Sequence, residues 1–204
     1  NIPGLFAAGD NASGIHGANR IGGSALSAAM VFGYRAGKVA AVRAREMDTP
    51  RPDKAVLKRR CVEWLASVWD RKSGLSFEEL REQIRDLAQA EMGVIREGKG
   101  LKRTLSSLVE IQELISSQMT LETKKMPDSV GASARFHAVR FAIETRNICL
   151  VGRMVASSAL LRNESRGGHY RLDYPNVNSE WDRLTCVYRG KDEEMVCEPI
   201  AVGN

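Results

Sequence analysis

The stretch from Pro3 to Gly37 constrains this chain more than any other part of it. It contains 8 of the chain's 18 glycines, and no charged residue lies between Arg20 and Arg35. Glycines at this density indicate a backbone with unusual dihedral angles, or one that another molecule approaches closely. The residue order predicts a short strand, a tight glycine-rich crossing and then a helix over about residues 22–47. We therefore expect a ligand to bind here.

Three side chains of this stretch carry chemistry. Asp10 follows the predicted strand at residues 4–8, and open α/β sheets bind ligands at the carboxyl ends of their strands; the structural alternative for Asp10 is an Asx turn or a cap. Arg20 ends the glycine-rich loop, where its guanidinium can hold a carboxylate bidentately or form a structural ion pair. His16 either orients the loop through backbone hydrogen bonds or takes a direct part in catalysis.

The start of the predicted helix is a second candidate binding element. Ser24 is a good N-cap residue. The backbone N–H groups of the first turn, around Ala25 and Leu26, are unpaired donors at the positive end of the helix dipole.

Downstream, the sequence predicts a bundle of helices. Residues 48–54 contain two prolines and read as a linker. Apolar residues at three- and four-residue steps then predict helices at about 54–70, 76–96, 101–119 and 133–163, and Ser76 with Glu79 has the pattern of a capping box. Short connections favour an antiparallel bundle of three or four helices. Alternating residues 185–200 predict a hairpin that turns at Lys191–Asp192.

The predicted fold class is therefore mainly α, with three parts. Residues 1–47 form a segment of an α/β domain, residues 48–163 a helical bundle domain, and residues 164–204 an extended tail that packs on both.

Two carboxylates, two arginines and a histidine gather between Glu164 and Asp173. They form either an acid/base site or a buried ion-pair network that locks the bundle to the first domain, and the network explains them with fewer assumptions. If the cluster lies near a ligand, we expect Arg166 and His169 to touch it.

Composition narrows the function classes. The net charge of +5 comes from basic clusters beside predicted helices, and with 6% aromatic residues a solvated basic face is favoured over nucleic-acid binding. No CxxC or Cys/His ligand spacing occurs, so no metal site is predicted. The four cysteines are interpreted as reduced thiols, with a pair facing each other across the hairpin as the alternative; they are Cys61, Cys149, Cys186 and Cys197. No apolar run is long enough to span a bilayer.

The run GLFAAGD…HGANRIGGSAL…VFGYRAG, within residues 4–37, resembles the second half of the FAD-binding domain in the fumarate reductase/succinate dehydrogenase flavoprotein family. That family includes L-aspartate oxidase and adenylylsulfate reductase. HGANR before a Gly-Gly helix entry is a highly specific motif, and the block ESRGGHYRLDYP at residues 164–175 follows in the family's order. The resemblance covers nearly the whole chain but only the C-terminal part of such a protein, so the chain, which begins at Asn1, is interpreted as a fragment or cleaved product.

The resemblance implies FAD as the cofactor and a small dicarboxylate, fumarate- or succinate-like, as the substrate of a hydride transfer. It implies that Arg20 binds a substrate carboxylate and that Asp10, where the family usually has Glu, binds the hydroxyl-bearing chain of FAD. It also implies that the turn at Ser24, Ala25 and Leu26 points at the N1 and C2 carbonyl side of the flavin ring.

The implied partners are an N-terminal flavin-binding portion or subunit and an iron–sulfur electron-transfer subunit. The implied location is cytoplasmic, or at a membrane through partner subunits and without direct insertion. Because the pyrophosphate loop and other family site residues would lie upstream, we expect this chain alone to bind FAD weakly or not at all and to be inactive. The alternative function is a separate helical interaction subunit that docks on a flavin-binding partner.

Overall fold

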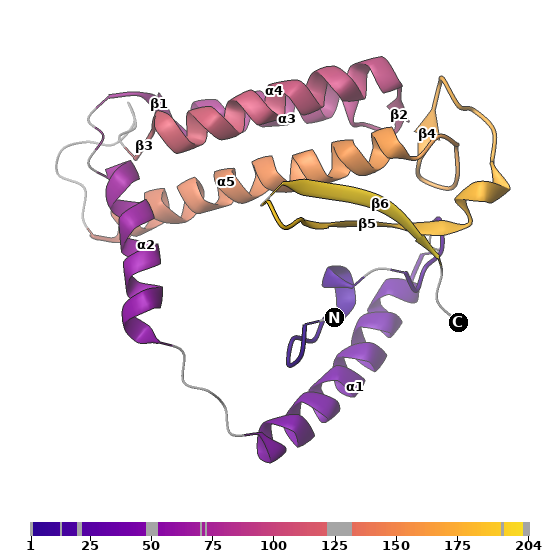
Figure 1. Ribbon diagram of the computed structural model, residues 1–204, viewed down its shortest axis with the longest axis horizontal. Coiled ribbons are helices and arrows are strands. Elements are labelled where there is room, and N and C mark those ends of the chain that lie inside the picture. The colour runs from indigo at the N-terminus through magenta and orange to yellow at the C-terminus, as the bar shows by residue number, and fades with distance from the viewer. Residues whose placement is uncertain are drawn as a thin grey trace. The chain divides into compact units, whose positions relative to one another are not determined.

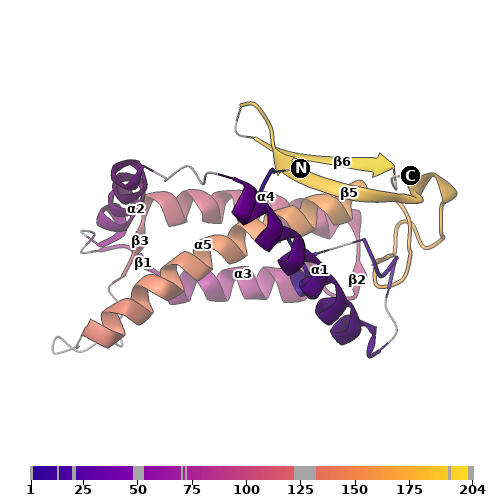
Figure 2. The ribbon, with the colours of Figure 1, turned by 90° about the horizontal axis from the view of Figure 1, so that it is seen from below.

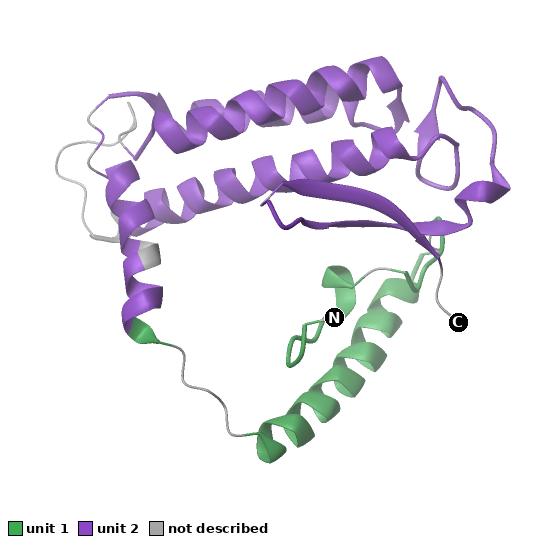
Figure 3. Ribbon diagram, viewed as in Figure 1, with its two compact units in different colours: residues 1–54 green, residues 55–204 purple. Residues whose placement is uncertain are grey.

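The computed structural model describes residues 2–12, 14–19, 22–47, 53–69, 71, 73–121, 132–192 and 194–201, without the side chains of residues 60, 61 and 132–135. The chain forms two compact units, Asn1–Lys54 and Ala55–Asn204 (Figure 3). Helices dominate the described residues, and the predicted fold class is confirmed. The predicted division at residues 47 and 163 stays a prediction.

The first unit consists of a 3₁₀ helix, η1 (Gly9–Asn11), and a long helix, α1 (Ser24–Glu46) (Figure 1). Residues 4–8 form a turn and irregular backbone, so the strand predicted there is wrong. A strand is stable only beside a hydrogen-bonded neighbour, and no described residue pairs with this segment. Helix α1 has no buried residue, and its apolar side chains Leu26, Met30 and Tyr34 are 71, 68 and 73% exposed.

The second unit is built on four helices that follow the predicted apolar periodicity. Ser76 and Glu79 form the predicted capping box, in which the Ser76 hydroxyl accepts from the Glu79 N–H and the Glu79 carboxylate accepts from the Ser76 N–H. Helices α3, α4 and α5 lie side by side, while α2 crosses one end of the group (Figures 1 and 2). The helices are α2 (Lys54–Trp69), α3 (Phe77–Glu91), α4 (Gly98–Ser117) and α5 (Ala132–Leu161).

The core of this unit lies between α3, α4 and α5. Small residues on α5 let α4 approach closely: a Cβ at Gly152 would lie 3.2 Å from Leu108 Cδ1. Five apolar residues of the predicted helix stripes are exposed and lie outside the core. Leu57 sits in the exposed first half of α2 and Ile95 follows the end of α3, and the other three lie on α5; they are Phe136, Val151 and Val155. Fully buried members of the core are Val68, Leu80, Ile84, Leu108, Ile115, Met119, Ala142 and Cys149.

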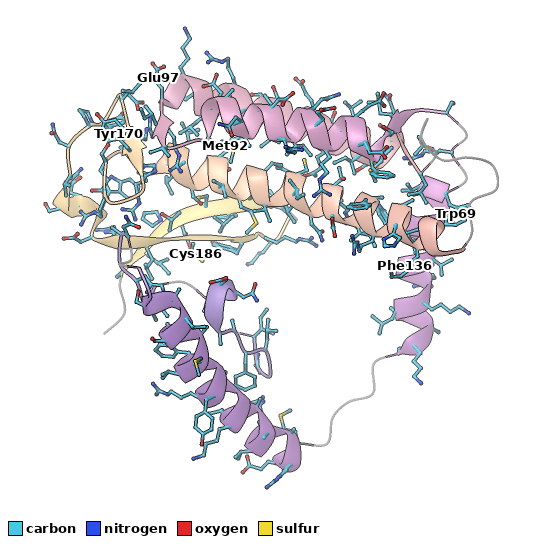
Figure 4. All side chains as sticks on the ribbon, turned by 180° about the vertical axis from the view of Figure 1, so that it is seen from behind. Trp69, Met92, Glu97, Phe136, Tyr170 and Cys186 are labelled. Atoms are coloured by element: carbon cyan, nitrogen blue, oxygen red, sulfur yellow. The ribbon has the colours of Figure 1, made fainter. Side chains whose placement is uncertain are left out.

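Two short parallel strand pairs close the two ends of the bundle. At one end β1 (Leu75–Ser76) pairs with β3 (Met119–Thr120), and at the other β2 (Ile95–Arg96) pairs with β4 (Tyr170–Arg171) (Figure 1). Figure 4 shows Glu97 and Tyr170 at the second end and Trp69 at the opposite end. The β2–β4 pair brings the segment after α5 against the start of α4.

The tail forms the predicted hairpin, with β5 (Arg183–Arg189) antiparallel to β6 (Met195–Ala201) beside α5 (Figure 1). Cys186 is paired with Glu198, and Cys197 with Val187. Because paired residues share a face and neighbours alternate, the two cysteines lie on opposite faces of the hairpin, and the alternative in which they face each other is wrong. Cys149, Cys186 and Cys197 are free thiols.

Candidate functional site

The glycine-rich loop requires glycine for its backbone conformation. Gly17 and Gly23 have φ angles of +61° and +89°, in the left-handed region that L side chains rarely adopt. A Cβ at either position would meet no atom within 4 Å, so packing within the described structure does not explain these glycines. The loop therefore combines a special backbone path with open space around it.

Helix α1 begins at a glycine N-cap. Gly23 occupies the N-cap position and has no side chain that could make a capping hydrogen bond, and Ser24 is the first helical residue. The prediction that Ser24 is the N-cap is wrong, because the left-handed Gly23 already turns the chain into the helix. The first-turn N–H groups, which include those of Ala25 and Leu26, thus carry the positive end of the α1 dipole without a side-chain carboxylate or hydroxyl from the N-cap.

The structure brings η1 beside the first part of α1. A Cβ at Gly9 would lie 3.5 Å from Ala29 Cβ. The 3₁₀ helix that carries Asp10 therefore packs against the first two turns of α1. Asp10 is exposed, and His16 is half-buried in the loop between the two helices. Ser24 and Leu26 are exposed and Ala25 is half-buried. Arg20, the predicted carboxylate clamp, lies outside the described residues, and the site roles of all six residues stay predictions.

The cluster after α5 is a connected network centred on Glu164, whose side chain is fully buried. Its carboxylate accepts hydrogen bonds from Arg162 Nη1, from Arg166 Nε at 2.9 Å and Nη2 at 3.1 Å, and from the Asn178 N–H at 2.9 Å. Burial alone raises the pKa of Glu164, but the bonds from Arg166, Asn178 and Arg162 together outweigh it and hold the pKa below its usual value. Glu164 is therefore a fixed, ionised group.

Arg171 links the end of α5 to the start of α4, and its side chain is 2% exposed. Its Nη1 donates to the carbonyls of Ala159 at 3.1 Å and Leu160 at 2.8 Å, which are orphan acceptors of the last turn of α5. Its Nε donates to Asp173 Oδ1 at 2.9 Å, and Asp173 Oδ2 accepts from the Gly98 N–H at the start of α4. The pair thus places a cation at the negative helix end and an anion at the positive one.

His169 is held as a neutral imidazole. Arg96 Nη1 donates to His169 Nδ1 at 2.9 Å, which leaves Nε2–H to donate to the Arg162 carbonyl at 3.3 Å. Burial lowers the pKa of His169, and the charges of Arg96, Arg162 and Arg171 lower it further. Because both ring nitrogens and both carboxylates are engaged, this cluster supports a structural network and not an acid/base site.

Sequence reasoning missed two arginines of this network. Arg162 lies two residues before Glu164, and only this short spacing could have pointed to it. Arg96 lies 73 residues from His169 and is brought to it by the β2–β4 pairing, so no local pattern pointed to it. The hydrogen bonds of these side chains run between α4, α5 and the tail, all inside the second unit.

Comparison with known proteins identifies relatives across the whole chain. A family model described as "Fumarate reductase flavoprotein C-term" matches residues 81–203. An uncharacterized FAD-dependent oxidoreductase of Methanocaldococcus jannaschii is 35% identical over 191 residues, which are 94% of this chain and 32% of that protein. An L-aspartate oxidase of a Nostoc species is 35% identical over 197 residues, covering 93% of this chain and 33% of the oxidase.

Solved structures agree with these matches. The apo Sdh1 complex of Mycobacterium smegmatis contains a chain that superposes with a TM-score of 0.83 at 32% identity, covering 97% of this chain and 33% of that one. This chain therefore spans about a third of the length of the relatives it matches. The predicted resemblance is confirmed, and within the described residues no helix is long and apolar enough to cross a membrane.

Proposed function

Because the chain belongs to the fumarate reductase flavoprotein family and matches its C-terminal part, we propose that it completes the flavin and dicarboxylate site of an FAD-dependent oxidoreductase. The observation that carries this proposal is the start of α1, where a left-handed glycine of the HGANRIGG motif occupies the N-cap position and contributes no capping side chain. Such an end offers backbone donors to a group that carries negative charge.

The residues of the first unit suit a flavin. The N–H groups at Ser24, Ala25 and Leu26 would donate to the carbonyl and ring-nitrogen side of the isoalloxazine, where their dipole favours the reduced, negatively charged ring. The exposed carboxylate of Asp10 would accept hydrogen bonds from the hydroxyl-bearing chain of FAD. Open space at Gly17 and Gly23 lets a flat ring approach the backbone. When bound, FAD supplies the hydride acceptor or donor.

We propose that Arg20 orients the substrate. Its guanidinium is permanently charged and forked, so it can bind one carboxylate of fumarate or succinate through two parallel hydrogen bonds. His16, half-buried in the same loop, would keep the loop in the conformation that presents Arg20 or contact the substrate itself. Holding the carboxylate fixes the angle at which the substrate carbon faces the cofactor.

The remaining parts of such an enzyme would be an N-terminal flavin-binding portion or subunit and an iron–sulfur electron-transfer subunit. The similarity to a chain of an Sdh1 complex supports the idea of partner subunits. The protein would lie in the cytoplasm, or at a membrane through such partner subunits. The second candidate function is a separate helical interaction subunit that docks on a flavin-binding partner.

The experiment is an Arg20→Lys variant of the flavoprotein that contains this chain, assayed with succinate and an electron-accepting dye and with fumarate and a reduced dye. Replacing the forked guanidinium of Arg20 by the single ammonium of lysine should lower kcat/KM about 100-fold, while the flavin content stays unchanged. The matched control is Arg35→Lys, because Arg35 stacks over the Phe32 ring at 5.7 Å on α1 and has no proposed role. An unchanged kcat/KM in Arg20→Lys would refute the substrate role.

The 204-residue chain by itself supplies a second measurement. We expect it to purify without yellow colour and without fumarate reductase activity, because it spans about a third of the length of the relatives it matches and would form only part of the site. Retention of stoichiometric FAD by the chain alone would contradict the view that it forms half of the site.

A further inference from the structure

The joint between the α3–α4 connection and the segment after α5 is held by polar contacts. Strands β2 and β4 pair over two residues each, and the Leu172 N–H adds a hydrogen bond to the Arg96 carbonyl at 2.8 Å (Figure 1). The apolar side chains of Val94, Ile95 and Leu172 are 77, 60 and 58% exposed. Because these side chains bury little apolar surface, the hydrophobic effect contributes little here, and the joint depends on its hydrogen bonds.

His169 lies at the centre of these hydrogen bonds. Arg96 Nη1 on β2 donates to its Nδ1 at 2.9 Å, and its Nε2 donates to the Arg162 carbonyl just after α5 at 3.3 Å. A guanidinium has N–H donors and no acceptor, so the bond to Arg96 exists only while Nδ1 carries no proton. The closed joint therefore requires a neutral ring at His169.

A proton on Nδ1 of His169 would turn this contact from attraction into repulsion, because one N–H would face another and both groups would be cations. Arg96 is not free to turn away, since its Nε donates to the carbonyls of Met92 at 3.3 Å and Gly93 at 2.9 Å. The ring is half-buried, so separation of the two strands lets a charged imidazolium reach water.

The charged groups that act on the ring come from each element around it, and they are cations. Arg96 belongs to β2, Arg162 follows α5 and Arg171 belongs to β4. Burial lowers the pKa of His169, and these three charges lower it further. Each of them makes a charged ring at His169 less favourable while the joint is closed.

The carboxylates of the same network do not offset the added charge. Glu164 is bonded to Arg166 at 2.9 Å, and Asp173 is bonded to Arg171 at 2.9 Å. The pKa of Glu164 lies below its usual value because its hydrogen bonds outweigh its burial, and the bond from Arg171 lowers the pKa of Asp173. Both carboxylates stay ionised in mild acid, so His169 is the group of this network that gains a proton there.

We propose that His169 is an acid-sensitive latch, whose protonation separates β2 from β4 while the helical core stays folded. Strand β4 remains on α5, because Arg171 Nη1 donates to the carbonyls of Ala159 and Leu160. Below about pH 6.5 each pH unit favours the open joint by up to about tenfold, until the pKa of the ring in the closed joint is reached. The latch uses none of the residues of the proposed flavin and dicarboxylate site.

The test is hydrogen–deuterium exchange followed by mass spectrometry on the flavoprotein that contains this chain, with rates corrected for the pH dependence of chemical exchange. The reporter is the Leu172 N–H, which donates to the Arg96 carbonyl across the joint. Its protection should fall at least about fivefold between about pH 7.5 and about pH 5. The amides of Leu108 and Ile111 in the core of α4 should change less than about twofold, because the bundle stays folded.

His169→Gln should keep the Leu172 N–H protected at both pH values, because glutamine carries an acceptor and a donor and does not titrate. His137→Gln is the matched control. His137 is exposed on α5, with its ring centroid 6.3 Å from that of Phe136, so this variant should lose protection at Leu172 as the unchanged protein does.

The proposal is overturned if the protection of Leu172 is the same at both pH values, or if His169→Gln loses it as the unchanged protein does. Equal loss at Leu108 and Ile111 would also overturn it, since the whole unit would then be unfolding. If His169→Gln fails to fold by circular dichroism, slow exchange of the C2–H of the His169 ring in the same peptides gives the pH at which the ring gains its proton. The loss at Leu172 should level off at that pH, and a loss that begins only below it would overturn the proposal.

Discussion

Glu164→Gln is the substitution whose effect can be worked out most fully from the structure. The change keeps the size of the side chain and removes its charge. The Glu164 side chain is fully buried, whereas those of Arg162 and Arg166 are 16 and 27% exposed. The carboxylate accepts four hydrogen bonds, two from Arg166, one from Arg162 and one from the Asn178 N–H. An amide can accept at only one of its two ends and would turn its NH₂ toward a donor at the other.

Removing one partner of a buried ion pair costs about 3–5 kcal/mol, because the other charge stays buried without compensation. The two arginines keep some acceptors here, since Arg162 also donates to the Trp181 carbonyl and Arg166 also pairs with Asp182 at 2.7 Å. We therefore expect Glu164→Gln to lose about 3 kcal/mol of unfolding free energy, the lower end of that range.

The assay is urea unfolding at neutral pH followed by circular dichroism, with the slope m checked for constancy. Glu144→Gln is the matched control, because Glu144 pairs with Arg81 at 3.1 Å and Arg140 at 3.4 Å while its side chain is 40% exposed. It should lose less than about 1 kcal/mol. A loss in Glu164→Gln that is no larger than in Glu144→Gln would refute the reasoning that the buried network holds the tail on the bundle.

Three further outcomes follow from the same region and from α3. Burial and neighbouring arginines lower the pKa of His169, so its contribution to stability is complete above about pH 6.5 and is lost as the pH falls through its folded-state pKa; urea midpoints should decline over that window, and less so in His169→Gln. Gly98→Ala should lose about 1–3 kcal/mol, since its Cβ would lie 2.6 Å from Arg171 Nη2 and from an Asp173 oxygen, whereas Gly168→Ala meets no atom within 4 Å and should be nearly neutral by the same assay. Ser76→Ala should lose about 1 kcal/mol in thermal or urea unfolding, and an unchanged midpoint would contradict the capping box.

Local patterns in the sequence predicted the elements of this fold well. The capping box at Ser76, the apolar steps of α3–α5 and the alternation of the hairpin depend on residues within one or two turns of each other, so a single stretch contains the information. The HGANR motif likewise pointed to the family that the comparisons confirm, because its loop and helix entry are contiguous in the chain. The roles of Arg20 and Asp10 stay predictions that rest on this motif.

Tertiary structure decided what depended on distant partners. The strand predicted at residues 4–8 needed a hydrogen-bonded neighbour that the described residues do not provide. In the hairpin, Cys186 pairs with Glu198 and not with Cys197, and this offset of one residue places the two cysteines on opposite faces. The β2–β4 pairing brought Arg96 to His169, and packing of the hairpin on α5 left a cavity that α4, α5 and the hairpin line. Sequence by itself thus determined the local elements and the family. Whether a charged side chain joined the buried network or stayed on the surface depended on burial, which only the assembled chain defines.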